Sequence, residues 1–438
     1  MKSRFLLIAF ALFLQFYAGA QTRPLTLNEA VATSLLNNYD IQLTRSDSLL
    51  AALDYAYADY AMLPRLSANA GFTFNRANQR QVFKDTTRGG PARSNNITTS
   101  INLDWTLFDG FRMFIAKERL NQLVNLSELQ IKAQVVTTVA DVMNVYYDIV
   151  RQEQQLRALE EQMQLSRERL QLAQYKFDIG TGAKPDVLQA QIDLNAQRSA
   201  YLTQQTNINK LKDQLNNLLV LPTGTDFYVT DTVITFNPAL TLDSVSTGIT
   251  ATNPELLLAQ KNIDIAELDL RMRRAERFPT VEFNSAYNFN RQNNLALVNP
   301  FQSLFSQNRG LNYGLSASIP IFNGFTTRRL IKAAEINIQS QELLYERNLA
   351  LINTGITTAY KDYDLYRRAL ELEEENIKLV RENLMIARER YRLGVSTFIE
   401  MREAQQSLAE ATNRLIQARY NTKIAEIELL RLRGDIVR

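Results

Sequence analysis

The sequence contains no cysteine and no histidine among its 438 residues. Without cysteine it has no disulfide and no lipid-modified N-terminal cysteine, which fits an exported protein that avoids chance disulfides. Without histidine it has no Ser-His-Asp triad, no imidazole metal ligand and not the usual general base. Only carboxylates remain for acid–base chemistry, and no pair of them lies in a recognisable catalytic motif. We therefore expect a protein that is not an enzyme and holds no metal or cofactor.

Long apolar runs are also absent beyond the N-terminus. No later segment approaches the ~18 uninterrupted apolar residues of a membrane-spanning helix, so any membrane span must be built from strands. Near the N-terminus, Lys2 and Arg4 precede a short apolar run over residues 5–17, and small residues follow at 18–20. This order predicts a signal peptide over residues 1–20, because the run is shorter than the ~20 residues of a membrane anchor.

Charge is nearly balanced, at +3. No basic stripe with interleaved aromatic residues is present, so we expect no nucleic-acid partner.

Nearly the whole sequence is present twice. A shift of 214 positions aligns Gly180 with Gly394 and Asp186 with Glu400, and it also aligns residues 108–111 with 322–325. Farther upstream the shift becomes 215, so one residue is gained or lost between positions 76 and 108. We therefore expect residues 21–438 to form a single unit of two tandem repeats, about 25–220 and 240–433.

Four segments alternate apolar and polar residues with period two, which predicts strands with one apolar and one polar face. They cover about 66–76, 97–108, 280–290 and 311–322. Residues 77–96 are charged and contain Gly-Gly-Pro, which predicts a loop. Strands of about ten residues with aromatic ends favour a transmembrane barrel over a half-buried sheet in a soluble domain. Four strands cannot close a barrel, so a membrane location requires self-assembly.

A very long helix is predicted after each strand pair. Residues 112–176 contain neither Pro nor Gly, and residues 326–393 contain no Pro. Apolar and small residues follow a 3.5-residue repeat, which indicates coiled-coil packing in antiparallel hairpins with tips at Gly180 and Gly394. Polar residues flank each seam, which suits the wall of a tube better than a solid bundle. The seam residues are Leu156, Leu159, Met163, Ser166, Leu170, Ala173 and Phe177, then Val187, Ala190, Leu194, Tyr201, Ile208, Leu211 and Leu215, and in the second repeat Met401, Ala404, Leu408, Ala411, Leu415, Ala418, Thr422, Ala425 and Leu429.

Shorter elements complete the prediction. We expect helices over residues 27–37 and 40–62 and a side layer within residues 222–252.

With these features the sequence resembles the TolC-like outer-membrane efflux protein family over essentially its whole mature length. The most specific matches are Phe177-x-x-Gly180, followed after six residues by Asp186, and Tyr391-x-x-Gly394, followed after six residues by Glu400. The resemblance implies an α+β membrane protein that forms a homotrimer. Its 12-stranded outer-membrane β-barrel, with four strands per protomer, would continue into a long antiparallel coiled-coil α-helical barrel in the periplasm.

The resemblance also implies a passive exit duct for a tripartite efflux pump or a type I secretion system. The duct would lie in the outer-membrane lipid and connect through a periplasmic adaptor (membrane fusion) protein to an inner-membrane transporter. The alternative is a periplasmic coiled-coil adaptor or scaffold protein. Adaptors usually carry one hairpin flanked by β-rich modules, whereas here strands precede each of two hairpins.

Two groups of site residues follow from the resemblance. The first is the pair of hairpin tips that would dock the adaptor, although glycines permit a tight turn in either case. Its residues are Gly180, Thr181, Gly182, Ala183, Gly394, Val395, Ser396 and Thr397. The second is a periplasmic constriction in which Asp186 and Tyr391 hold the tips shut and Glu400 and Glu403 form an acidic ring that attracts cations.

One position departs from the family pattern. Where a member of the family that this sequence resembles has a basic residue two positions after the second glycine, this sequence has Ser396. Asp186 then needs another partner, for which Lys184, Arg392 and Arg402 are candidates. Alternatively, Asp186 is only an acid at a helix start, favoured by the helix dipole, and Glu400 and Glu403 lie on a solvated outer face.

Overall fold

The computed structural model describes residues 23–299 and 301–436. Contacts divide the chain into two compact units. Met1–Ser46, Leu129–Leu258 and Glu346–Arg438 form the first, called the hairpin unit; Asp47–Glu128 and Ala259–Tyr345 form the second, called the sheet unit. The predicted signal peptide lies outside the described residues.

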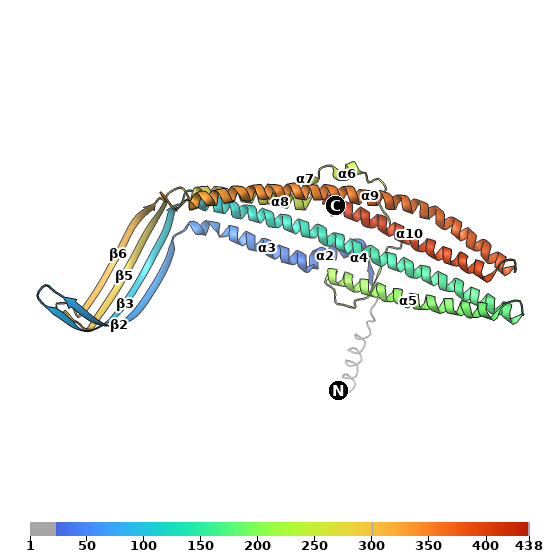
Figure 1. Cartoon of the computed structure of the whole chain (residues 1–438), viewed down its shortest axis with the longest axis horizontal. Helices are drawn as coiled ribbons and strands as arrows, with labels where there is room; N and C mark the ends of the chain where they lie inside the picture. The colour runs from blue at the N-terminus through green and yellow to red at the C-terminus, as the bar shows by residue number, and fades with distance from the viewer. Residues whose placement is uncertain (1–22, 300, 437–438) are drawn as a thin grey trace, which may run out of the picture. The chain divides into compact units, whose positions relative to one another are not determined.

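The sheet unit is built on one four-stranded antiparallel sheet in the order β2-β3-β5-β6 (Figure 1). The strands span Arg65–Val82 (β2), Thr87–Phe108 (β3), Thr280–Ala296 (β5) and Phe305–Ser318 (β6). Each edge strand, β2 and β6, pairs with a single neighbour. Among the described residues the sheet therefore has two unpaired edges.

The prediction of a loop over residues 77–96 is wrong except at residues 83–86, which connect β2 to β3. β2 and β3 stay paired from Arg76 opposite Arg93 to Val82 opposite Thr87. The ladder satisfies the backbone N–H and C=O groups of this segment whatever its local sequence. Pro91 is tolerated within β3 because the pairing of β3 with β5 ends at Arg93, so that β3 has a neighbour on one side only at Pro91.

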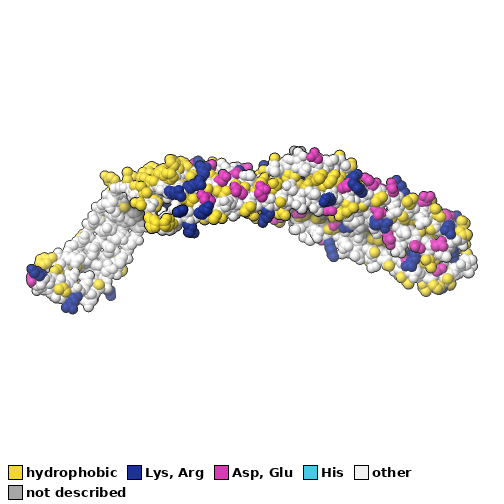
Figure 2. Space-filling view, turned by 45° about the horizontal axis from the view of Figure 1, so that its top comes forward, with side chains coloured by type: hydrophobic (Ala, Val, Ile, Leu, Met, Phe, Trp, Pro, Cys, Tyr) yellow, Lys and Arg dark blue, Asp and Glu magenta, His cyan; other side chains and the backbone are white. Residues whose placement is uncertain are grey.

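Side chains of the sheet alternate between two faces, as the period-two pattern predicts. Cross-strand partners place Phe72 opposite Ile97, and Tyr287 opposite both Ile101 and Leu311. The other face carries mainly Asn, Ser, Thr and Gly, and Figure 2 shows one face of the strands as largely white, the colour of uncharged polar side chains and backbone. Large side chains exposed on the apolar face are Leu66, Phe72, Phe74, Ile101, Trp105, Tyr287, Leu311, Tyr313 and Leu315. A continuous exposed apolar face of this length is typical of strands that contact lipid.

No helix in the described part of the chain has a stretch apolar and long enough to cross a membrane.

Four long helices form two antiparallel hairpins (Figure 1). In the first, α4 spans Arg112–Asp178 and α5 spans Lys184–Leu219; in the second, α9 spans Thr326–Arg392 and α10 spans Phe398–Arg433. The two hairpins match in length, with 67 residues in the longer helix and 36 in the shorter one.

The coiled-coil seam is largely buried in α5 and α10. Buried seam residues are Val187, Ala190, Leu194, Ile208 and Leu215 in α5, and Met401, Ala404, Ala411, Ala418, Thr422, Ala425 and Leu429 in α10. In α4 the structure differs from the prediction, because Phe177 is exposed and Arg169 is buried with Ser166 and Ala173. A helix buries whichever residues its neighbours cover, and here the neighbours supply a partner for a charge.

The hydrophobic core of the hairpin unit contains side chains from both hairpins and from short elements packed against them. Tyr146, Ile149, Leu215 and Leu219 are fully buried in one cluster, together with Ile427 of α10. Burying an aliphatic or aromatic side chain of this size stabilises the fold by about 1.5–3 kcal/mol.

The remaining elements are short. α2 (Leu27–Asn37) coincides with the predicted helix, and the second predicted helix is split into α3 (Tyr39–Ala56) and a 3₁₀ helix, η2 (Ala58–Met62). β1 (Arg23–Leu25) pairs in parallel with β4 (Phe227–Val229). The other helices are α6 (Leu242–Ser246), α7 (Ile249–Thr252) and α8 (Pro254–Ala275).

Candidate functional site at the hairpin tips

Both hairpins turn on glycines with left-handed backbone angles. Gly180 has φ of 77° and Gly394 has φ of 77°. In the first turn the Thr181 and Gly182 N–H groups both donate to the Lys176 carbonyl at 2.8 Å. The eight predicted tip residues lie in these two turns, exposed except for the half-buried Gly182 and Ser396. The turns therefore present backbone and small side chains at the surface.

Gly182 is required by close approach rather than by its backbone angles. A Cβ atom there would lie 2.9 Å from the backbone of Lys176 and Phe177, whereas a Cβ at Gly180 would meet nothing within 4 Å. We expect Gly182→Ala to open the first turn at a cost of about 1–3 kcal/mol, because backbone atoms cannot move aside cheaply. Gly180→Ala should cost about 1–2 kcal/mol through its positive φ alone.

Hydrogen exchange of amides in residues 176–186, followed by mass spectrometry, measures this local opening. The expected order of exchange rate is Gly182→Ala, then Gly180→Ala, then wild type. Equal exchange in the Gly182→Ala variant and the wild type would contradict the close approach.

Tyr391 lies in a small core between the tips. It is 4% exposed and packs with Ala190 of α5 and with Phe398 and Met401 of α10. The Lys176 ammonium donates to the Tyr391 carbonyl at 2.7 Å and lies 3.9 Å from the centre of its ring. Burial, followed by the nearby Asp186 carboxylate, raises the pKa of the Tyr391 hydroxyl. Tyr391 thus connects α9 with both α4 and α5.

Asp186 has no side-chain hydrogen bond or ion pair among the residues that the structure describes. The three candidate partners are engaged elsewhere. Lys184 lies over the Phe177 ring at 5.0 Å, Arg392 pairs with Glu389 at 2.9 Å, and Arg402 pairs with Asp193 at 3.1 Å. The half-buried Asp186 carboxylate lies in the first turn of α5. Within one chain, the Asp186 carboxylate therefore interacts favourably with the dipole of α5. Its charge remains available to pair with a group of another molecule.

Glu400 and Glu403 are both exposed on α10. The Thr397 hydroxyl caps this helix by accepting from the Glu400 N–H at 3.2 Å, and the Ser396 hydroxyl donates to the Glu400 carboxylate at 2.7 Å. Arg390 lies 3.9 Å from the same carboxylate. Ser396 therefore serves the start of α10.

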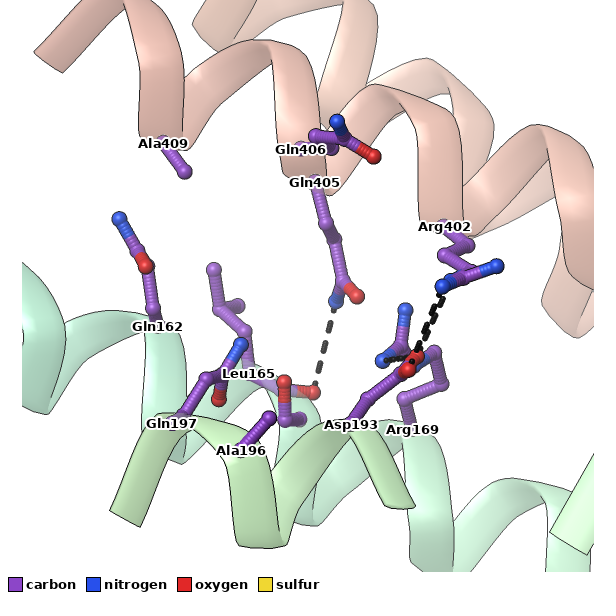
Figure 3. A pocket seen from close by; sticks show the side chains of 11 residues that line it. Gln162, Leu165, Arg169, Asp193, Ala196, Gln197, Arg402, Gln405, Gln406 and Ala409 are labelled. Carbon is purple, nitrogen blue, oxygen red and sulfur yellow. Dashed lines mark hydrogen bonds and ion pairs between the residues drawn. The ribbon is translucent and has the colours of Figure 1, made fainter. Parts of the chain in front are cut away.

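A buried ion cluster, which sequence reasoning missed, joins three helices (Figure 3). The Arg169 side chain of α4 is 3% exposed and its guanidinium lies 2.7 Å from Asp193 of α5. Arg402 of α10 reaches the same carboxylate at 3.1 Å, and the Gln189 amide donates to it at 2.8 Å. Burial lowers the pKa of the Arg169 guanidinium, and Asp193 opposes that shift. The cluster borders a cavity of about 270 Å³.

Two further contacts connect the first hairpin with the second. Arg388 of α9 pairs with Glu168 of α4 at 3.0 Å, and the Gln405 amide of α10 donates to the Leu165 carbonyl at 3.4 Å. Together with the buried ion cluster and Lys176, they hold the two tips together within one chain. The arrangement positions the helices relative to one another. No group of three or more acidic residues that could hold a metal ion occurs in the part of the chain that the structure describes.

The same fold is known among outer-membrane channels. The outer-membrane channel OprN has a TM-score of 0.75 and 19% identity, with 93% of this chain and 90% of that chain covered. In sequence, the probable outer membrane lipoprotein SilC of Salmonella typhimurium is 22% identical over 413 residues, with 93% of this chain and 85% of SilC covered. Outer membrane protein TolC of Vibrio cholerae is 18% identical over 381 residues, 86% of this chain and 83% of TolC.

The family model described as outer membrane efflux protein matches residues 30–219 and 248–435. The chain belongs to the outer membrane efflux protein family. It is an outer-membrane channel for efflux or secretion, which confirms the main sequence prediction over the periplasmic adaptor. The relatives are channels rather than enzymes.

Proposed function

We propose that three copies of this chain close one 12-stranded barrel and form a passive exit duct. The observation that carries the proposal is the sheet of four strands with an apolar face and two unpaired edges. In lipid an unpaired strand edge costs several kcal/mol for each unsatisfied backbone group, so β6 of one copy must pair with β2 of the next. The smallest membrane barrels have about eight strands, which excludes closure by one chain.

A second feature supports association between copies. α9 exposes one large apolar side chain every seven residues, although none of these side chains is covered within the chain. An isolated helix drifts by about 20° per heptad, so a strict seven-residue stripe indicates a supercoiled partner helix. The exposed stripe consists of Leu351, Leu365, Leu372, Leu379 and Ile386 of α9, with Thr358 at the remaining position, and Leu393 continues the spacing just beyond the helix.

The tips of the two hairpins are the proposed docking surface for a periplasmic adaptor, through which an inner-membrane transporter supplies the energy. Besides the eight turn residues, apolar side chains are exposed beside both turns. They are Ile179 at 54%, Leu393 at 69% and Ile399 at 72%, next to Val395 of the second turn at 65%. Exposed apolar groups clustered at one end of a water-facing element are typical of a protein contact.

The constriction is proposed to lie at the same end. Asp186 has a free carboxylate beside the buried Tyr391, which supports an ion pair supplied by another copy in the closed trimer. Glu400 and Glu403 are exposed, and threefold symmetry would bring six of these carboxylates around one water-filled neck. Such a ring attracts cations and repels anions.

Replacing Glu400 and Glu403 together by Ala is therefore expected to reduce cation preference to a nearly unselective conductance. Reversal potentials in planar bilayers under a salt gradient measure it, with Glu410→Ala on the same helix as the matched control. Unchanged selectivity in the double variant would remove both residues from the lumen.

The mass of detergent-solubilised protein tests the duct itself. We expect a particle of three chains with strong helical circular dichroism. A monodisperse single chain that stays soluble without detergent would contradict the proposal.

A further inference from the structure

Each of the four strands carries an arginine on the apolar face, toward the end of the sheet away from Arg65 and Phe108; β2 carries a second one, Arg80, farther along. Arg76 of β2 lies directly opposite Arg93 of β3. Directly opposite residues share a face. Arg291 of β5 lies opposite Ile97, which in turn lies opposite Phe72, and Arg309 of β6 lies opposite Phe289. These four residues are called the arginine row.

The described residues do not neutralise the charge of the arginine row. Residues 76–96 and 288–310 contain seven Lys and Arg and one acidic residue, Asp85. All four side chains are exposed, and among the described residues none of them forms an ion pair. Arg291 lies 5.5 Å from the centre of the Phe305 ring and Arg309 lies 5.3 Å from that of Phe289. Figure 2 shows dark blue side chains at this end of the strands.

The position of the row follows from the height of the apolar face. From Leu66 to Phe74 a strand rises about 27 Å at ~3.4 Å per residue, or about 21 Å in height at a tilt of ~40°. The lipid-facing band of such barrels is about 25 Å tall, so Arg76 is the next residue on this face beyond the band. A long arginine side chain at that edge keeps its stem on apolar surface and places its guanidinium among lipid head groups.

We propose that the arginine row binds the phosphate groups of a phosphorylated glycolipid in the outer leaflet of the outer membrane. The guanidinium fork matches phosphate geometry with two parallel hydrogen bonds, and the neighbouring aromatic and aliphatic side chains match acyl chains. Since the helices are on the periplasmic side of a channel in this family, the opposite strand ends reach the outer leaflet. The inference rests on the barrel proposed above, in which the row would occur three times around the circumference.

The test uses the purified full-length protein in an uncharged detergent, titrated with bisphosphorylated lipid A and analysed by native mass spectrometry. The variant replaces Arg76, Arg93, Arg291 and Arg309 by Gln. We expect its affinity for lipid A to fall at least about tenfold, since one basic residue near an anionic lipid surface contributes about fivefold. Replacing the same four residues by Lys should lose less, because the charge remains while the fork is lost.

The matched control is Arg328→Gln with Arg329→Gln, which removes two exposed cations of α9 that form no ion pair with any residue that the structure describes. Its affinity should equal that of the wild type. Lipid A stripped of its phosphates should bind wild type no more tightly than it binds the four-Gln variant. Inorganic phosphate at the same concentration should not displace lipid A, and displacement would indicate a plain anion site instead of a lipid site.

Equal affinity of the four-Gln variant and the wild type, or equal affinity of wild type for lipid A with and without phosphates, would overturn the proposal. The same spectra report the number of chains in each particle. A wild type that is monomeric contradicts the barrel, whereas a trimeric variant with unchanged lipid binding contradicts the arginine row alone. If the four-Gln variant does not fold, the two-residue variants at Arg76 with Arg93 and at Arg291 with Arg309 are each expected to lose part of the affinity.

Discussion

Replacing Asp193 by Ala is expected to destabilise the hairpin unit by about 3–5 kcal/mol. The change leaves the Arg169 guanidinium, 3% exposed, without its carboxylate in a low-dielectric site. Thermal unfolding in detergent, followed by circular dichroism at the helical minimum, measures the loss. Because Asp193 also binds Arg402 of α10, the change should loosen the contact between the hairpins and increase tryptic cleavage near the tips.

Two further variants show whether the loss of stability comes from leaving the buried Arg169 charge unpaired or from losing the ion pairs themselves. Arg402→Ala removes a partner that is 46% exposed, and an ion pair of that exposure contributes only about 0–1 kcal/mol. Arg169→Leu combined with Asp193→Leu replaces the buried pair by apolar side chains and should recover much of the stability. A melting temperature of Asp193→Ala equal to that of the wild type would show that Arg169 is solvated in solution.

Replacing Tyr391 and Asp186 together by Ala is expected to raise the basal conductance of the channel. The Tyr391 ring fills the small core between the hairpin tips, and truncating a buried aromatic side chain to Ala costs about 3–5 kcal/mol. Loss of that core frees the tips to separate, and loss of Asp186 removes the charge available for a link between copies. Single-channel recording in planar bilayers without the adaptor measures the effect.

Two single variants show how much of the rise in basal conductance comes from lost packing and how much from lost charge. Tyr391→Phe keeps the ring and should stay closed if packing holds the tips together. Asp186→Asn keeps the shape and should open the channel if an ion pair between copies contributes. A double Ala variant that conducts no more than the wild type rejects this constriction.

The sequence predicted most of the fold because its main signals are local. Glycines with positive φ mark the hairpin tips, and the alternation around Phe72 and Ile101 marks the strands. It failed over residues 77–96, where pairing between β2 and β3 outweighs a polar, glycine-containing sequence. A strand is stabilised by its neighbour, and no local pattern records that neighbour.

The site was predicted less completely, for a similar reason. Tyr391 is buried in the small core at the tips, and its role in the constriction stays a prediction. Arg169 was missed because a seam was read from apolar residues, which favoured the adjacent Leu170. A charged residue three positions after Ser166 and four before Ala173 is the signal that could have indicated a buried ion pair. The partner of Asp186 could not be predicted, because no group in the described part of the chain pairs with its carboxylate.

The most direct test of the account is a cross-link between the two edges of the sheet. The natural sequence has no cysteine, so a pair can be introduced without background, with Ser67 or Asn69 of β2 and Ser316 or Ser318 of β6 replaced by Cys. Within one chain these strands are separated by β3 and β5, roughly 14 Å apart, whereas a disulfide needs Cα atoms within about 7 Å. If three chains close one barrel, oxidation of at least one pair gives covalent trimers on a non-reducing gel, while each single-cysteine variant stays monomeric. Monomers alone for every pair, from protein that has the mass of one chain in detergent, would contradict it.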